Sequence, residues 1–178
     1  EHLWTLVTAW MSSPRTPLIG LLLLLTLGIA MERRLGARRF LVTALPSHVC
    51  GVGLALVCHP IIAPMWPAWG RQLLSRSVAG VGLLLLGPFM VVAGTMNATW
   101  RRRIHWLTLL AAILIVGVTG KPTAIAWLGA VSAGIVLAGP LARPLTPDTA
   151  IPSTPHSERN MVALIVCAWA GVLILTVL

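Results

Sequence analysis

A few serine and histidine side chains in this sequence have the chemistry that nucleophilic catalysis needs. A serine hydroxyl becomes a nucleophile when an imidazole within hydrogen-bond reach takes its proton. The serines in or beside apolar stretches are Ser47, Ser77 and Ser132, and the histidines are His48 and His59. Ser47 and His48 are adjacent, so on a helix their side chains diverge by about 100° and cannot pair directly. Any Ser–His pair must therefore be assembled by two different helices.

Two such pairings are open on the sequence. Ser132 could meet His48 if their helices touch at equal depth, and His59, at the end of its apolar stretch, could reach Ser77 or Ser75. The structural alternative is that the serines bond their own backbone and that His48 bonds a neighbouring helix. We expect this alternative. His48 is the residue to examine, because a polar group inside a membrane is often functional.

The composition indicates which kind of element positions these side chains. Of the 178 residues, 57% are hydrophobic and only 10% are charged, and the mean hydropathy is +0.91. A soluble domain has about 25% charged residues. Because this chain has too little charge to cover a surface that faces water, we predict an all-α, polytopic transmembrane helix bundle.

The net charge of +9 does not indicate a nucleic-acid partner, because the cations stand in short clusters that flank apolar stretches. Cys50, Cys58 and Cys167 are widely spaced and form no disulfide or metal motif. We expect no metal and no cofactor. Arginine greatly outnumbers lysine, and Ala, Gly and Pro are abundant, which is typical of a high-GC bacterium. The predicted location is the inner (plasma) membrane of a bacterium.

Six apolar stretches come close to or reach the length of a membrane span, which is about 20 residues. They cover residues 16–31, 40–59, 77–96, 104–119, 123–141 and 161–178. Residues 60–76 are predicted to form the longest external loop. Residues 142–160 are rich in Pro, Ser and Thr and predict a linker. The predicted organisation is a membrane core over residues 1–141, this linker, and an additional C-terminal transmembrane helix.

The cations predict the orientation of the bundle. If the six spans alternate, the segments 32–39, 97–105 and 142–160 lie on one side and hold nine of the thirteen cations. Cytoplasmic loops are enriched in Lys and Arg. We therefore expect these segments in the cytoplasm. Residues 32–39 are called the elbow below, and Glu32 is expected to pair with arginines there.

The elbow and its flank resemble the rhomboid family of intramembrane serine proteases. In that family a transmembrane helix ends in the pattern G-x-x-x-E-x-R-L-G and turns on the cytoplasmic side into the next helix. The segment "GIAMERRLG" follows this pattern. The matching residues are Gly28, Glu32, Arg34, Leu35 and Gly36.

Two further blocks support the resemblance. The family's nucleophile helix carries a Gly seven residues after the second Gly of its G-x-S-G motif, and Gly80 and Gly87 have this spacing. The family's last core helix reads A-H-x-x-G-x-x-x-G, of which Ala126 and Gly134 remain. The resemblance implies that the first five spans are core helices two to six. The first core helix is then expected upstream of Glu1.

The positions that carry the family's chemistry are vacant in this chain. The resemblance places the nucleophile at Ala79 and the general base at Trp127, and the oxyanion-stabilising residues at Thr16 and Gly20. Alanine has no nucleophilic atom, and an indole cannot accept the proton. With four roles vacant together, the resemblance implies a pseudoprotease rather than an enzyme, and an active rhomboid protease is the function these residues favour least.

Three functions stay open on the sequence. The first is a rhomboid-like scaffold that binds transmembrane segments or lipids without proteolysis. The second is the membrane domain of a larger lipid-modifying enzyme that resembles lysyl-phosphatidylglycerol synthases. The third is a structural subunit of a larger membrane complex. In each case the lipid bilayer is an expected partner.

Overall fold

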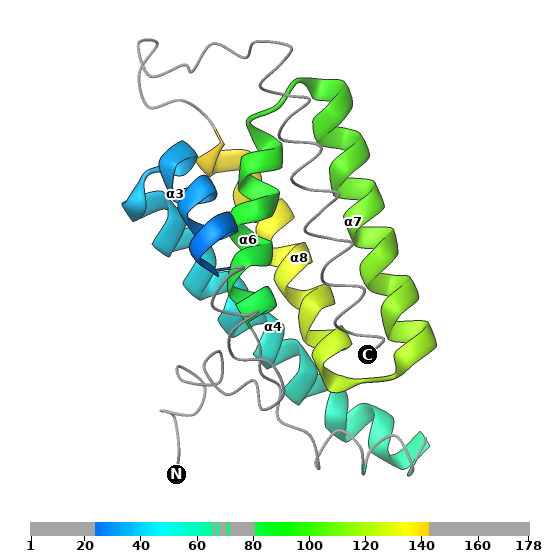
Figure 1. Ribbon diagram of the computed structural model, residues 1–178. Coiled ribbons are helices and arrows are strands. Elements are labelled where there is room, and N and C mark those ends of the chain that lie inside the picture. The colour runs from blue at the N-terminus through cyan, green and yellow to red at the C-terminus, as the bar shows by residue number, and fades with distance from the viewer. Residues whose placement is uncertain (1–23, 66, 68–70, 72–80, 143–178) are drawn as a thin grey trace. The chain divides into compact units, whose positions relative to one another are not determined.

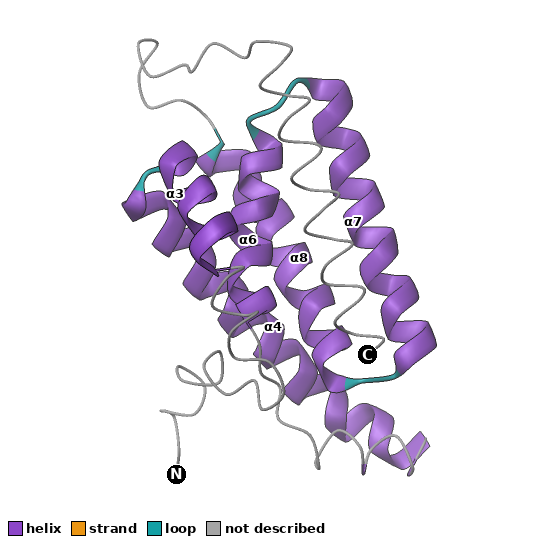
Figure 2. Ribbon diagram, viewed as in Figure 1, coloured by secondary structure: helices purple, strands orange, loops and turns teal. Residues whose placement is uncertain are grey.

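The computed structural model describes residues 24–65, 67, 71 and 81–142, and the regular structure of these residues is entirely helical (Figure 2). The chain divides into two compact units, Glu1–Ala142 and Arg143–Leu178, and the described residues all belong to the first. The predicted all-α class is confirmed. The predicted span 161–178 and the linker beyond Ala142 lie outside the described residues.

The described part begins with a short π-helix, η1, and continues with five α-helices (Figure 1). Their bounds are η1 Leu24–Gly28, α3 Ile29–Leu35, α4 Ala37–Met65, α6 Val81–Gly94, α7 Ala98–Thr119 and α8 Pro122–Leu141. The helices α4, α7 and α8 are long and apolar enough to cross a membrane. This finding supports the membrane class that the composition predicted.

Two helix boundaries differ from the predicted ones. Helix α4 continues to Met65, with Pro60 and Pro64 inside it, so the predicted external loop 60–76 was wrong in its first six residues. Membrane helices tolerate proline because other groups satisfy the freed carbonyls. Helix α7 begins at Ala98 because the Asn97 side chain accepts a hydrogen bond of 3.0 Å from the Trp100 N–H. Arg101, Arg102 and Arg103 therefore lie on the first turns of α7 and not in a turn before it.

The elbow is a turn of a single residue between two helices. Helix α3 ends at Leu35 and α4 begins at Ala37. Between them, Gly36 has φ +79° and ψ 149°, and its N–H donates to the Glu32 carbonyl oxygen at 2.7 Å. Glycine populates this backbone region readily because it has no Cβ. The last Gly of the elbow pattern is therefore explained by its backbone conformation.

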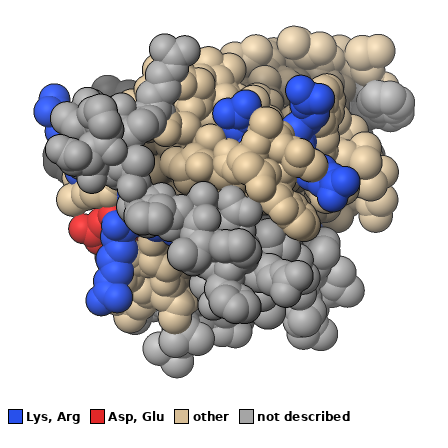
Figure 3. Space-filling model, turned by 90° about the horizontal axis from the view of Figure 1, so that it is seen from above, with Lys and Arg blue, Asp and Glu red and all other residues tan. Residues whose placement is uncertain are grey.

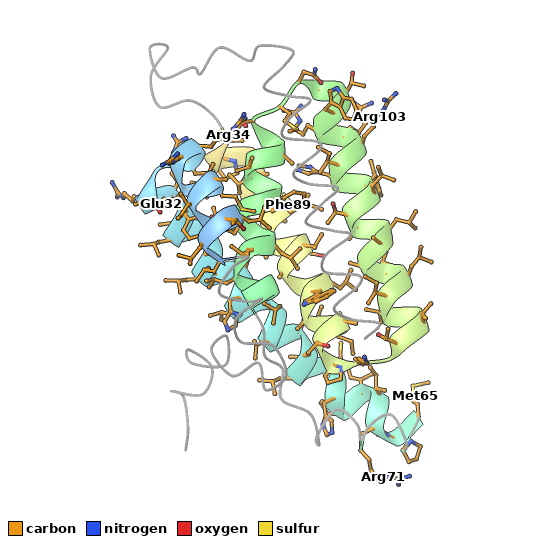
Figure 4. All side chains as sticks on the ribbon, viewed as in Figure 1. Glu32, Arg34, Met65, Arg71, Phe89 and Arg103 are labelled. Carbon is orange, nitrogen blue, oxygen red and sulfur yellow. The ribbon has the colours of Figure 1, made fainter. Side chains whose placement is uncertain are left out.

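The arginine-bearing ends of the described helices lie together. Arg39 Nη1 donates to the carbonyl oxygen of Leu141 at 3.2 Å, which joins the start of α4 to the end of α8. A Cβ on Gly94, the last residue of α6, would lie 3.0 Å from the Ala142 Cβ. Figure 4 shows Arg34 and Arg103 at this end and Arg71 and Met65 at the other. The elbow and the start of α7 thus share one end of the bundle, as alternating spans require.

Arg39 should stabilise this end of the bundle by its hydrogen bond to the Leu141 carbonyl oxygen, one of the last carbonyls of α8. The last carbonyls of a helix have no partner within the helix, and a charged donor contributes more than a neutral one. We expect Arg39→Gln to lower the free energy of unfolding in detergent by about 1–3 kcal/mol, because the shorter amide does not reach Leu141. The adjacent, exposed Arg38 gives the control. If Arg38→Gln and Arg39→Gln lower the free energy of unfolding equally, the loss comes from the change in net charge and not from the bond to Leu141.

Helix α8 is the centre of the described bundle and packs against α4, α6 and α7. Its buried face consists mostly of small residues, namely Ala124, Ala126, Gly129, Ala130, Gly134 and Ala138. In a bilayer the hydrophobic effect does not hold helices together, so close packing of small residues must do so. The candidate site lies where these small residues bring three helices into contact.

Candidate functional site

Gly87 and Gly134, two of the glycines in the rhomboid-like blocks, lie in direct contact. A Cβ built on Gly134 would lie 3.0 Å from the Cα of Gly87. A Cβ on Gly87 would overlap Ser47 Oγ and would lie 2.5 Å from Ser47 Cβ and 2.8 Å from the Thr43 carbonyl oxygen. Helices α4, α6 and α8 therefore meet at Gly87, where the absence of a side chain permits the close approach.

A second close approach lies further along α4 and involves residues that the sequence analysis did not single out. A Cβ on Gly129 of α8 would lie 2.9 Å from the Gly51 Cα, and a Cβ on Gly51 would lie 2.5 Å from the Ala126 carbonyl oxygen. Small residues at four-residue spacing, such as Ala126 and Ala130, mark this face of α8 as one that packs closely, but they do not identify its partner. Together the two contacts fix α8 against α4.

Trp127, which the resemblance places at the general base, is a packing residue. Its indole lies against α6, where the ring atoms are 3.7–3.9 Å from a Cβ built on Gly82. The same side chain packs on a buried apolar cluster of Ala55, Leu83, Ile125, Ala126 and Ala130. Ala79, at the nucleophile position, lies outside the described residues, as do Ser77 and Gly80.

The described serines use their hydroxyl protons within their own helices. Ser47 Oγ donates to the Thr43 carbonyl oxygen at 2.7 Å, and Ser132 Oγ donates to the Leu128 carbonyl oxygen at 2.8 Å. The prediction that these serines bond their own backbone is confirmed. Ser132 is exposed, whereas His48 is only 4% exposed. The predicted pairing of these two side chains stays a prediction.

His59 is half-buried near the far end of α4. Its Nε2 atom is buried and meets no hydrogen-bond partner among the described residues. The serines that it was predicted to reach, Ser75 and Ser77, lie outside the described residues. Thr16 and Gly20, the expected oxyanion positions, lie outside them as well.

The elbow residues have structural roles. Gly28 is buried, and a Cβ built on it would lie 3.7 Å from Leu85 Cδ2 of α6. Leu35 is buried, whereas the Glu32 side chain is exposed and Arg34 is partly buried. Figure 4 shows Glu32 and Arg34 at the arginine-bearing end of the bundle. The predicted pairing of Glu32 with arginines stays a prediction.

A polar histidine that the sequence analysis overlooked links two helices near the same end. His105 Nε2 of α7 donates to the Met90 carbonyl oxygen of α6 at 3.0 Å. His105 also lines a cavity of about 290 Å³ between α7 and α8, together with Arg101, Arg102, Trp106, Leu109 and Ile135. The run "RRRIH" at the start of a span is the signal that marks this place in the sequence.

The described residues contain no group of three His, Cys, Asp or Glu side chains placed to hold a metal ion. Cys50 is exposed and Cys58 is half-buried, and both are free thiols. Comparison with models of protein families, with curated proteins and with solved structures finds no match to this chain. The resemblance to the rhomboid family therefore rests on the sequence blocks described above and stays a hypothesis.

Proposed function

We propose that this chain is a rhomboid-like membrane scaffold that binds transmembrane segments or lipids and does not cleave them. The observation that carries the proposal is the contact between α6 and α8, where Trp127 packs against Gly82. In the family that the sequence resembles, this region of the bundle holds the general base. An indole offers only an N–H donor, so it cannot take a proton from a nucleophile.

The bonding of the serines supports the absence of proteolysis. A hydroxyl that donates to a backbone carbonyl, as Ser47 and Ser132 do, is not activated by a base. The small-residue contacts at Gly51 and Gly87 keep the helices close together, which suits a rigid frame. A closely packed helix bundle without an activated serine among its described residues favours binding over catalysis.

The outward faces of α4 and α7 offer apolar surface to a bilayer or to another helix. The large exposed side chains include Leu41, Leu45, Val49, Leu56 and Val57 on α4, and Trp106, Leu107, Leu110, Leu114 and Val118 on α7. Extensive exposed apolar surface marks a membrane or protein interaction site. We place the elbow and the start of α7 on the cytoplasmic side of a bacterial inner membrane, because that side carries the excess of arginine.

The absence of proteolysis can be tested with a fluorophosphonate probe on the full chain in native membranes. We expect no labelling above that of a heat-denatured sample, because Ser47 and Ser132, the serines among the described residues, donate to backbone carbonyls. We also expect transmembrane peptides added in proteoliposomes to stay intact. An active serine hydrolase in the same membranes controls for probe access. Labelling of the chain that disappears in Ser132→Ala or Ser77→Ala would overturn the proposal.

A further inference from the structure

The cavity between α7 and α8 combines cations at one end with an apolar wall at the other. Arg101 and Arg102 lie in the first turns of α7, followed by His105 and Trp106, and then by Leu109. On a helix with a rise of about 1.5 Å per residue, Arg101 and Leu109 differ in depth by about 12 Å. Ile135 of α8 completes the apolar wall. The groove therefore changes from charged to apolar along the direction of the membrane normal.

This order of side chains matches a phospholipid. The phosphate of an anionic lipid lies at the membrane surface, where Arg101 and Arg102 are, and its acyl chain extends toward Leu109 and Ile135. Trp106 is 66% exposed at the intermediate depth, where amphipathic aromatic rings are favoured. Basic pockets between transmembrane helices on the cytoplasmic side bind anionic head groups. Figure 3, which views the bundle from above, shows several Lys and Arg side chains spread over this end, with other residues between them.

We infer that the groove lined by Arg101, Arg102, His105, Trp106, Leu109 and Ile135 binds one anionic phospholipid through its phosphate. The inference rests on the proposed scaffold function only in placing the bundle in a bilayer. An anionic lipid, rather than an apolar helix, is favoured by charge complementarity, because an apolar helix offers no counter-charge to two arginines. His105 is held in place by its bond to Met90, so the polar end of the groove is anchored to α6.

Other arginines at this end of the bundle do not line the groove, so they provide controls for the effect of charge alone. Arg103 lies over the Trp100 ring, with its Cζ 5.7 Å from the centroid, and is not part of the groove lining. Arg33 and Arg38 are exposed, belong to the elbow at the same end of the bundle and do not line the groove either. The pair Arg33→Gln and Arg38→Gln therefore removes the same charge as the pair Arg101→Gln and Arg102→Gln without touching the groove.

The test uses the full chain in phosphatidylcholine nanodiscs that contain a small fraction of phosphatidic acid with a photoreactive group in its acyl chain. After irradiation, we expect adducts on Trp106 or Leu109 of α7. Unlabelled phosphatidic acid should compete, whereas phosphatidylcholine and inorganic phosphate should not. In Arg101→Gln/Arg102→Gln the affinity should fall roughly tenfold to thirtyfold, since each cation near the surface contributes about one tenfold step or less. In Arg33→Gln/Arg38→Gln it should change less than about twofold.

Several outcomes would overturn the inference. Equal losses in the two double variants would show general surface charge and no built site. Competition by inorganic phosphate would show an anion site that does not need the lipid. Labelling of residues 161–178 in place of α7, with a cross-link between that segment and Leu109, would show that the chain covers its own groove. If a photoreactive phosphatidylcholine labels α4 and α7 alike, the groove does not select an anionic lipid, and the inference fails while the scaffold proposal is unaffected. No labelling by either lipid would instead remove the bilayer location on which both depend.

Discussion

Gly51→Ala should lower the free energy of unfolding by about 1–3 kcal/mol, as overpacking of a well-packed interior does. The added Cβ would lie 2.5 Å from the Ala126 carbonyl oxygen and 2.9 Å from Leu83 Cδ2. The leucine can rotate away, but the carbonyl belongs to the backbone of α8 and cannot. Relief therefore requires α4 and α8 to move apart, which also opens the contact between Gly129 and Gly51. The loss is measured by SDS-induced or thermal unfolding in detergent.

Gly53 provides the matched control for this prediction. It lies two residues further along the same helix, and a Cβ built on it meets nothing within 4 Å. Gly53→Ala should therefore keep or raise stability, by up to about 1 kcal/mol, because alanine has the higher helix propensity. If both variants lose the same stability, the close approach at Gly51 is not what holds α4 and α8 together.

Gly87→Ala is expected to have a loss of similar size, about 1–3 kcal/mol, at the other contact. Here the Cβ would meet the side chain of Ser47 and the carbonyl oxygen of Thr43, which is 2.8 Å away. The Ser47 hydroxyl cannot turn aside without leaving its bond to Thr43. Because α8 lies on another side of Gly87, at Gly134, the strain should spread to all three helices.

A double variant separates steric overlap from other effects at Gly87. Ser47→Gly removes the overlapping side chain, so Ser47→Gly/Gly87→Ala should lose less stability than the sum of the two single losses. Such non-additivity is expected for residues in contact. Gly82→Ala on the same helix is the control, since its Cβ would lie at an ordinary 3.7 Å from the Trp127 indole. If the loss of stability in the double variant equals the sum of the two single losses, Ser47 and the added methyl group at position 87 do not overlap.

The helical class of the protein and the approximate place of three predicted spans, 40–59, 104–119 and 123–141, were predictable from the sequence. Long apolar stretches such as 123–141 need few tertiary contacts to be helical, because a bilayer requires every backbone group to be bonded within its segment. The ends of the helices were less predictable. Residues 60–76 were predicted to be a loop, yet α4 continues through Pro60 and Pro64 to Met65. The Asn97 cap placed the start of α7 at Ala98.

The candidate site also has features that the sequence indicated and features that it did not. Gly87 and Gly134 each belong to a block that resembles the rhomboid family, and the structure brings these two residues into contact. The contact of Gly51 with Gly129 was missed because small residues are frequent in every helix of this chain, so spacing alone does not select the pairs that meet. His105 was missed because its partner, the Met90 carbonyl, is a backbone atom that every residue carries and that no sequence pattern marks.

The sequence by itself determined that this protein is helical, that it carries too little charge for a water-facing surface, and that Trp127 cannot act as a base. These are properties of composition and of single side chains, and they hold in any arrangement of the helices. Only the tertiary structure decided that Gly87 and Gly51 are the points where helices touch and that Arg39 binds the end of α8. It also decided that Arg101, Arg102 and Leu109 line one groove with Ile135. Those contacts depend on how each helix is rotated about its axis and how deep it lies relative to its neighbours. The sequence does not specify either, because small residues occur on every helix and allow many of them to pack closely.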